Sequence, residues 1–144
     1  MKTQYLLLTL MCMLCLPLNA QKKEKCSEEE FLHKKQTYIM QEAGLTAEEA
    51  KQFFPIYVEL QNKKKAINRT VWKTAQKGKL PQTTESEYND ILNDFIMAEE
   101  QNTELDKEYL KKYQSVLSNK KIYMVLRAEI KFNRNMLKII QDKK

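Results

Sequence analysis

Residues 45–78 read LTAEEAKQFFPIYVELQNKKKAINRTVWKTAQKG, and this stretch decides the fold class. It opens with Thr46, which Glu49 follows three residues later, the spacing of a capping box at a helix N-terminus. Its apolar residues recur at intervals of three, four or seven and so form one stripe: Phe53, Tyr57, Leu60, Ile67 and Val71. We therefore predict one long amphipathic helix from Thr46 to Gly78, kinked at Pro55 because proline lacks an N–H.

Capping residues predict three more helices around this one. The helices are expected over residues 27–44, 84–116 and 118–140, with N-caps at Ser27, Thr84 and Ser118. No segment shows the alternation of a half-buried strand between turn signals, so the chain is predicted to be all-α. The two longest helices, roughly 45–50 Å each, favour an elongated four-helix antiparallel hairpin. Such a thin body cannot bury every apolar face, so we expect either a dimer or an exposed apolar groove.

Residues 1–20 have the three-part pattern of a secretory signal peptide. Lys2 is followed by an apolar run from Tyr5 to Leu16, and the cleavage region ends in the small residue Ala20. The apolar run is shorter than the about 20 residues that span a bilayer. We therefore expect export through a cleaved leader, one helical domain over residues 21–144, and no integral membrane segment in that domain.

Charge is segregated along the chain, whose formal net charge is +6. The net charge is +5 over residues 45–79, −8 over residues 80–108 and +8 over residues 109–144. One interpretation is neighbour pairing, with an acidic third helix between a basic second and a basic fourth helix. Because the protein is expected to be exported, we predict no nucleic-acid partner. An anionic membrane surface, an envelope polymer or an acidic protein fits the positive charge better.

Two helical rows of cations are the main candidate binding features. Lys65, Arg69, Lys73 and Lys77 recur every four residues beside Trp72, and a second row follows the fourth helix from Lys120. Cations beside apolar side chains suit unfolded or acidic polypeptides, because charge speeds encounter and apolar contact prolongs it. The candidate client-binding or partner-binding residues are Lys65, Arg69, Trp72, Lys73, Arg127, Lys131, Arg134 and Lys138. The alternative is that both rows form salt bridges with the acidic third helix.

The sequence gives little support to catalysis or metal binding. His33 is the sole histidine, and two separated glycines cannot form a phosphate loop, so we predict no enzyme and no cofactor. Cys26, Glu29 or Glu30, and His33 could share one helical face and offer an open zinc or copper site. Three ligands of this kind do not close a site, so no metal is predicted. Cys26 is either a free thiol or a partner for a second copy of the chain.

The two helix starts carry a family resemblance. LTAEE at residues 45–49 and LSNKK at residues 117–121 resemble the doubled LTxxQ signature of the Spy/CpxP family of periplasmic proteins. The PIY run after Phe53 and the tail around Ala128 and Phe132 resemble the variant common in Bacteroidetes. The motif residues, with Glu49 and Lys121 in place of glutamine, are Leu45, Thr46, Glu49, Leu117, Ser118 and Lys121.

The resemblance implies a periplasmic four-helix hairpin that forms a cradle-shaped homodimer and has no catalytic residues. It implies an ATP-independent, holdase-type chaperone of envelope stress that binds partly unfolded envelope proteins. The alternative role it implies is a small periplasmic sensor or accessory protein with one regulatory membrane protein as its partner, such as an anti-sigma factor or a sensor-kinase domain. Metal-sensing relatives use histidine-rich ligand sets, which this chain lacks.

Overall fold

The computed structural model describes residues 27–142, so the predicted signal peptide and Cys26 lie outside the described residues. Within this range the chain forms helices and no strand, which confirms the all-α prediction. The elements are α2 (Glu28–Ala43), α3 (Ala47–Ala75), the 3-10 helix η2 (Gln76–Lys79), α4 (Glu85–Gln114) and α5 (Asn119–Gln141). In the same range, no helix is both long enough and apolar enough to cross a membrane.

Each α-helix begins at the capping residue that the sequence predicts. The N-caps, whose side chains accept a hydrogen bond from the backbone N–H three residues on, are Ser27, Thr46, Thr84 and Ser118. At Thr46 and Thr84 the backbone N–H of the cap residue also donates a hydrogen bond to the carboxylate of Glu49 or Glu87. This second bond completes a capping box. Gly44 ends α2 with a φ of 64°, a left-handed conformation that favours glycine.

The predicted end of the second helix at Gly78 is wrong. α3 ends at Ala75, and the chain continues through η2, which contains Gly78. The carbonyl of Gly78 accepts a hydrogen bond from the Tyr88 hydroxyl at 3.0 Å. A Cβ at this position would lie 3.3 Å from side-chain atoms of both Tyr88 and Ile91. Glycine therefore serves the close approach of α4 to the turn rather than the termination of α3.

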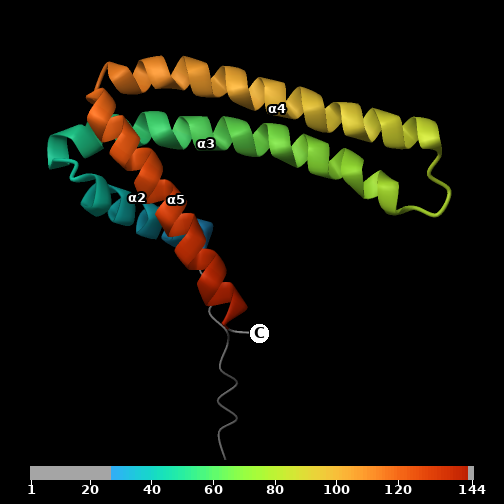
Figure 1. Cartoon of the computed structure of the whole chain (residues 1–144), viewed down its shortest axis with the longest axis horizontal. Helices are drawn as coiled ribbons and strands as arrows, with labels where there is room; N and C mark the ends of the chain where they lie inside the picture. The colour runs from blue at the N-terminus through green and yellow to red at the C-terminus, as the bar shows by residue number, and fades with distance from the viewer. Residues whose placement is uncertain (1–26, 143–144) are drawn as a thin grey trace, which may run out of the picture.

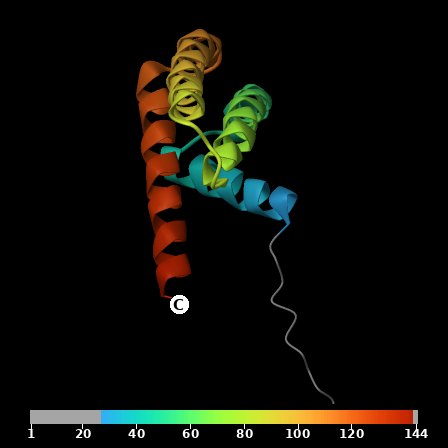
Figure 2. The same ribbon diagram turned by 90° about the vertical axis from the view of Figure 1, so that its right-hand side faces the viewer.

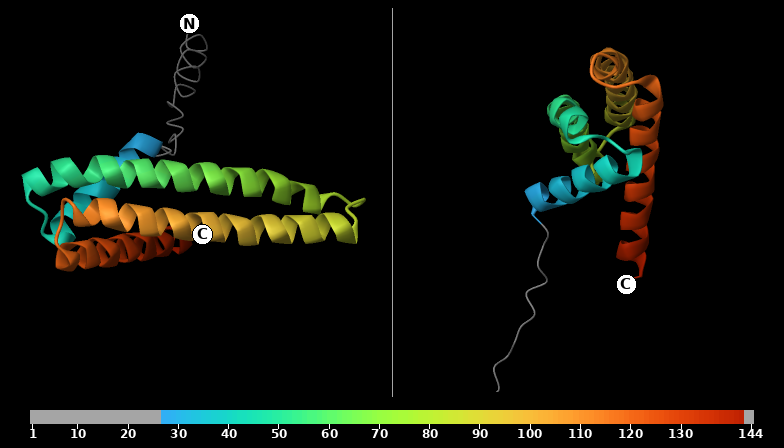
Figure 3. Two further views of the ribbon diagram at one scale, coloured as in Figure 1. Left: turned by 90° about the horizontal axis from the view of Figure 1, so that it is seen from above. Right: turned by 90° about the vertical axis from the view of Figure 1, so that its left-hand side faces the viewer.

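The helices form two pairs that meet at one end of the molecule. α3 and α4 pack along each other as a long antiparallel hairpin, while α2 packs against α5. The second pair leaves the hairpin at a slant from the end opposite η2 (Figure 1). Figures 2 and 3 show α5 along one edge of the molecule, and α2 leads away from it at an angle in Figure 2. The elongated hairpin agrees with the prediction.

The main hydrophobic core lies where the two pairs meet, a region that we call the junction. Its most deeply buried large side chains, with 2 % exposure or less, are Ile39, Phe53, Tyr57 and Tyr109. The rings of Phe53 and Tyr113 lie 4.8 Å apart and join α3 to α4. Towards η2 the buried apolar side chains of the hairpin are fewer, namely Val71, Ile91 and Ala98. The buried apolar side chains of the fold are thus concentrated at one end.

The predicted pairing of a basic fourth helix with an acidic third helix is wrong. In the described residues, the ion pairs that join two helices are Lys35–Glu129, Lys64–Asp106, Lys65–Glu28, Lys121–Glu49 and Lys131–Glu42. The cations of α5 therefore pair with α2 and α3, and one interhelical pair involves α4. The reason is geometric, because α5 packs against α2 and touches α4 little.

Candidate functional site

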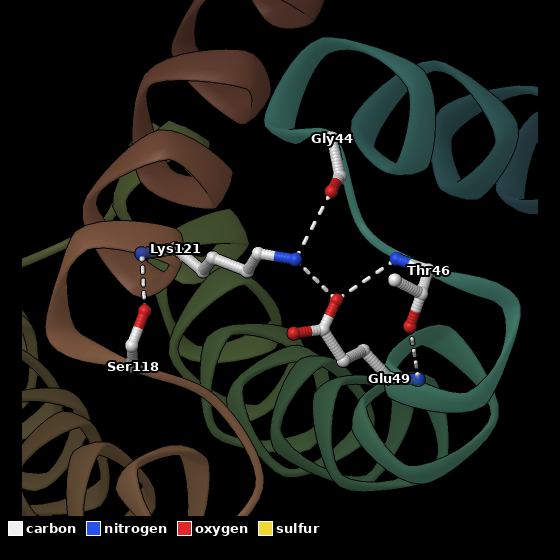
Figure 4. A network of polar contacts seen from close by, with 5 residues as sticks. All are labelled: Gly44, Thr46, Glu49, Ser118 and Lys121. Atoms are coloured by element: carbon white, nitrogen blue, oxygen red, sulfur yellow. Dashed lines mark hydrogen bonds and ion pairs between the residues drawn. The ribbon is translucent and has the colours of Figure 1, made fainter.

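The two helix-start motifs lie face to face at the junction (Figure 4). The ammonium of Lys121 donates to the carbonyl of Gly44 at 3.1 Å and to the carboxylate of Glu49. The same carboxylate oxygen accepts the N–H of Thr46 at 2.8 Å. These bonds from Lys121 and Thr46 hold the pKa of Glu49 below its usual range. The two positions that depart from glutamine therefore form an ion pair between α3 and α5.

The motif leucines have a structural role. Leu45 and Leu117 are each 6 % exposed and belong to the core of the junction. Ser118 caps α5 by accepting the backbone N–H of Lys121 at 3.3 Å. The six motif residues thus join the two turns of the chain at the junction.

A second polar anchor at the junction was not selected from the sequence. One carboxylate oxygen of Glu129 accepts hydrogen bonds from the Lys35 ammonium at 2.6 Å and from the Tyr57 hydroxyl at 2.8 Å. Lys35 is only 9 % exposed, so this contact joins α2, α3 and α5 inside the protein. Burial and the charge of Glu129 raise the pKa of Tyr57, which keeps it a neutral donor. One feature of the sequence could have indicated this anchor: Glu129 is the sole acidic residue between residues 119 and 141.

The far half of the hairpin leaves a cluster of large apolar side chains exposed, which we call the hairpin patch. Its residues, between 38 % and 62 % exposed, are Trp72, Tyr88, Leu92, Phe95 and Ile96. The α4 members recur at helical spacing on one face. Trp72 of α3 meets Phe95 edge to face, with ring centroids 6.2 Å apart, so the patch spans both helices. Sequence analysis selected Trp72 as a candidate binding residue but none of the α4 residues.

The predicted cation row on α3 lies next to the hairpin patch and is partly neutralised. Lys65, Arg69 and Lys73 are all exposed. Lys65 forms an ion pair with Glu28 at the start of α2, and this bond lowers the pKa of Glu28, with a smaller contribution from the charge of Arg69. Lys73 lies two turns further along and has no ion pair within residues 27–142. The cation nearest to Trp72 in sequence is therefore available to a partner.

The predicted cation row on α5 belongs to a different surface. Arg127, Lys131 and Arg134 line a shallow groove between α2 and α5, where Lys131 pairs with Glu42 at 2.7 Å. The hollows along the hairpin are lined by α3 and α4 residues alone. The structure therefore places the eight predicted binding residues on two surfaces, with Lys65, Arg69, Trp72 and Lys73 on one and Arg127, Lys131, Arg134 and Lys138 on the other.

The described residues hold no cluster of three or more histidine, cysteine or acidic side chains that could bind a metal ion. His33 is exposed and borders a shallow hollow beside Met40 and Phe54. The rest of the predicted ligand set depends on Cys26, which falls outside the described range. The fold therefore offers apolar and cationic surfaces as its main candidate sites.

Comparison of the chain with protein-family models, with curated proteins and with solved structures gave no match.

Proposed function

We propose that this protein is a periplasmic, ATP-independent holdase-type chaperone, acting as a homodimer, that binds partly unfolded envelope proteins on the hairpin patch. The observation that carries the proposal is the exposure of five large apolar side chains on two packed helices, with Trp72 and Phe95 in contact. Exposed apolar clusters of this kind mark interaction surfaces in soluble proteins. The resemblance of the helix starts to the Spy/CpxP signature supports the same role.

The shape of the surface favours a flexible polypeptide over a small molecule. The hollows along the hairpin are shallow and open, whereas sites for small ligands are concave and enclose most of the ligand. An unfolded chain presents apolar side chains that can cover the patch piece by piece. Burial stabilises such contacts by about 25 cal/mol per Å² of apolar surface, so a few side chains give weak and reversible capture. Reversibility allows release without ATP.

The charges beside the patch suit a transient complex. Lys73 and Arg69 lie on α3 near Trp72, whereas α4 contributes acidic residues such as Glu99. Charges at the rim of an interface act mainly on the association rate and are screened by salt. The mechanism is therefore electrostatic encounter followed by apolar retention.

The test is suppression of aggregation of a chemically unfolded model client, with a matched pair of variants. Leu92→Ser with Ile96→Ser removes apolar side chains that are 62 % and 58 % exposed in the hairpin patch. Leu137→Ser with Ile130→Ser removes side chains of 61 % and 58 % exposure from α5. We expect the hairpin variant to lose most of the suppression and the α5 variant to retain it. Equal loss in both variants, or no suppression by the parent protein, would contradict the proposal.

Trp72 provides a direct readout because it is the single tryptophan of the chain. Its indole is 61 % exposed, so contact with an apolar client should shift its emission to shorter wavelengths. A client without tryptophan keeps the signal specific. Isolation of complexes from envelope extracts separates the roles further, because one stoichiometric partner would favour the sensor or accessory function over a chaperone.

A further inference from the structure

The outer face of α5 carries an apolar stripe that no other described helix covers. Its residues recur at positions i, i+3, i+7 and i+14 and are 49 % to 61 % exposed: Tyr123, Leu126, Ile130 and Leu137. The stripe extends about 21 Å along the helix at 1.5 Å per residue. The opposite face, with Ile122, Val125, Ala128 and Phe132, is buried, so the stripe is additional to the apolar surface that the fold uses.

A row of cations runs beside this stripe over the same length. Its members are all exposed: Lys120, Arg127, Lys131, Arg134 and Lys138. The guanidinium of Arg127 lies 5.9 Å from the ring centroid of Tyr123, which ties the two rows together. Lys131 pairs with Glu42 of α2 at the edge of the row. For the other four cations, the described residues provide no ion pair.

Acidic side chains are absent from the outer face of α5 within the described range. The single acid between residues 119 and 141 is Glu129, whose carboxylate turns inward to Lys35 and Tyr57. A helix with an apolar stripe, a cationic flank and no exposed acid complements a surface that is both anionic and apolar below its charged layer. Membranes of anionic phospholipid have this construction.

We propose that α5 docks the protein on anionic phospholipid membranes, lying parallel to the surface. Tyr123, Leu126, Ile130 and Leu137 enter the boundary between headgroups and acyl chains. The cations beside them contact the phosphates, because long Lys and Arg side chains can extend their charges to the headgroup layer. A symmetric contact between the α5 helices of two copies would instead place two rows of like charge together, which disfavours that alternative.

The position of α5 in the fold suits this role. It forms one edge of the molecule in two perpendicular views, so a flat surface can approach it from outside (Figures 2 and 3). The hairpin patch lies on α3 and α4, away from the groove that α2 and α5 line. Membrane docking is therefore independent of client capture, and each can be tested without the other.

The experiment is co-sedimentation of the mature chain, residues 21–144, with vesicles in the absence of any client. Vesicles of phosphatidylglycerol and phosphatidylethanolamine are compared with vesicles of phosphatidylcholine at physiological salt. We expect binding to the anionic vesicles alone. Arg134→Glu with Lys138→Glu should reduce it at least about tenfold, since each cation near an anionic surface contributes several-fold to affinity.

Two further variants separate specific docking from general attraction to negative charge. Lys77→Glu with Lys79→Glu changes the net charge equally, but on exposed residues of η2, and should leave binding nearly unchanged. Ile130→Ser with Leu137→Ser keeps every charge and should weaken binding several-fold through the lost apolar contact. Circular dichroism and thermal melts check that each variant remains folded.

Three results would overturn the proposal. The first is no preference for anionic vesicles. The second is equal loss of binding in the η2 and α5 charge variants, which would indicate attraction through net charge alone. The third is the absence of vesicle binding together with self-association that the α5 variants abolish, which would assign this face to a second copy of the chain.

Discussion

The junction and the far half of the hairpin use similar residues in opposite ways. At the junction, aromatic side chains from α3 and α4 are buried against each other, as Phe53 and Tyr113 show. In the far half, Trp72 and Phe95 also touch, yet Trp72 is 61 % exposed. The difference follows from the neighbours, because α2 and α5 cover the junction and leave the rest of the hairpin open.

This contrast indicates that one end of the helix pair stabilises the fold, whereas the other end presents the surface that we propose for client binding. The junction core combines buried side chains from α2, α3, α4 and α5, which therefore contribute to the free energy of unfolding. Those of the hairpin patch keep much of their apolar surface in water, where it remains available to another molecule. Substitutions at the two ends should therefore have different consequences, and four predictions follow this difference in order of expected size.

The largest effect on stability is expected from Phe53→Ala. Phe53 is fully buried and contacts the rings of Phe54, Tyr57 and Tyr113. Its truncation should lower the free energy of unfolding by about 3–5 kcal/mol. Trp72→Ala in the hairpin patch should cost less than about 1.5 kcal/mol, because the indole is mostly in water already. Urea denaturation followed by circular dichroism compares the two, and similar losses would contradict the division.

The second prediction concerns the buried charge of Lys35. Glu129→Leu should destabilise the protein by about 2–4 kcal/mol, because it leaves the ammonium of Lys35 in the core without a counter-charge. Adding Lys35→Met should recover much of the loss, since a buried ion pair can often be replaced by apolar residues. Denaturation of both variants provides the measurement. A double variant as unstable as the single one would mean that packing, and not charge, explains the effect.

Two buried valines allow the same substitution in the junction, on α5, and in the far half of the hairpin, on α3. Val125 is 2 % exposed and belongs to the junction core, whereas Val71 is 7 % exposed and lies in the far half. We expect Val125→Ala to cost about 2 kcal/mol and Val71→Ala about 1 kcal/mol, because the thin far half can relax around the missing methyl groups. The order of the two denaturation midpoints checks this, and a reversed order would mean that the far half of the hairpin contributes more to stability than the junction.

The smallest expected effect is on the pH dependence of stability. The pKa of Glu49 is lowered in the folded state, chiefly by Lys121, so the ionised carboxylate stabilises the fold above its ordinary pKa of 4.5. This contribution is lost as the pH falls through the lowered pKa. In Lys121→Gln the pKa of Glu49 should move back towards its ordinary value. The variant should therefore be less stable than the parent near pH 7 and lose less stability below pH 4.5, as thermal melts can measure.

Much of the fold could be predicted because its signals are local. The caps at Ser27, Thr46, Thr84 and Ser118 place all four helix starts, since a hydroxyl followed by a helical pattern satisfies nearby N–H groups. The sequence placed the end of this helix at Gly78, whereas α3 ends at Ala75. The role of Gly78 could not be predicted because it depends on contact with Tyr88, ten residues further along the chain. Local patterns carry no information on such a contact.

The candidate sites were less predictable because they depend on how the helix pairs cross. An apolar stripe on α4 looks the same in sequence whether another helix covers it, as at Tyr109, or leaves it in water, as at Leu92. The partner of Lys121 was likewise hidden, because Glu49 lies 72 residues away. Periodicity identified the correct helix faces, and only the arrangement of the pairs separated the buried from the exposed parts.

Amide hydrogen exchange with and without an unfolded client tests the division between the two ends most directly. Without client, the amides of the junction around Phe53 and Tyr113 should exchange more slowly than those between residues 85 and 96. The reason is that exchange of the junction amides requires unfolding of a larger part of the protein. With client, the account predicts new protection around Trp72 and residues 88–96, and no change at the junction. Protection confined to α2 and α5, or an unchanged hairpin in the presence of bound client, would contradict it.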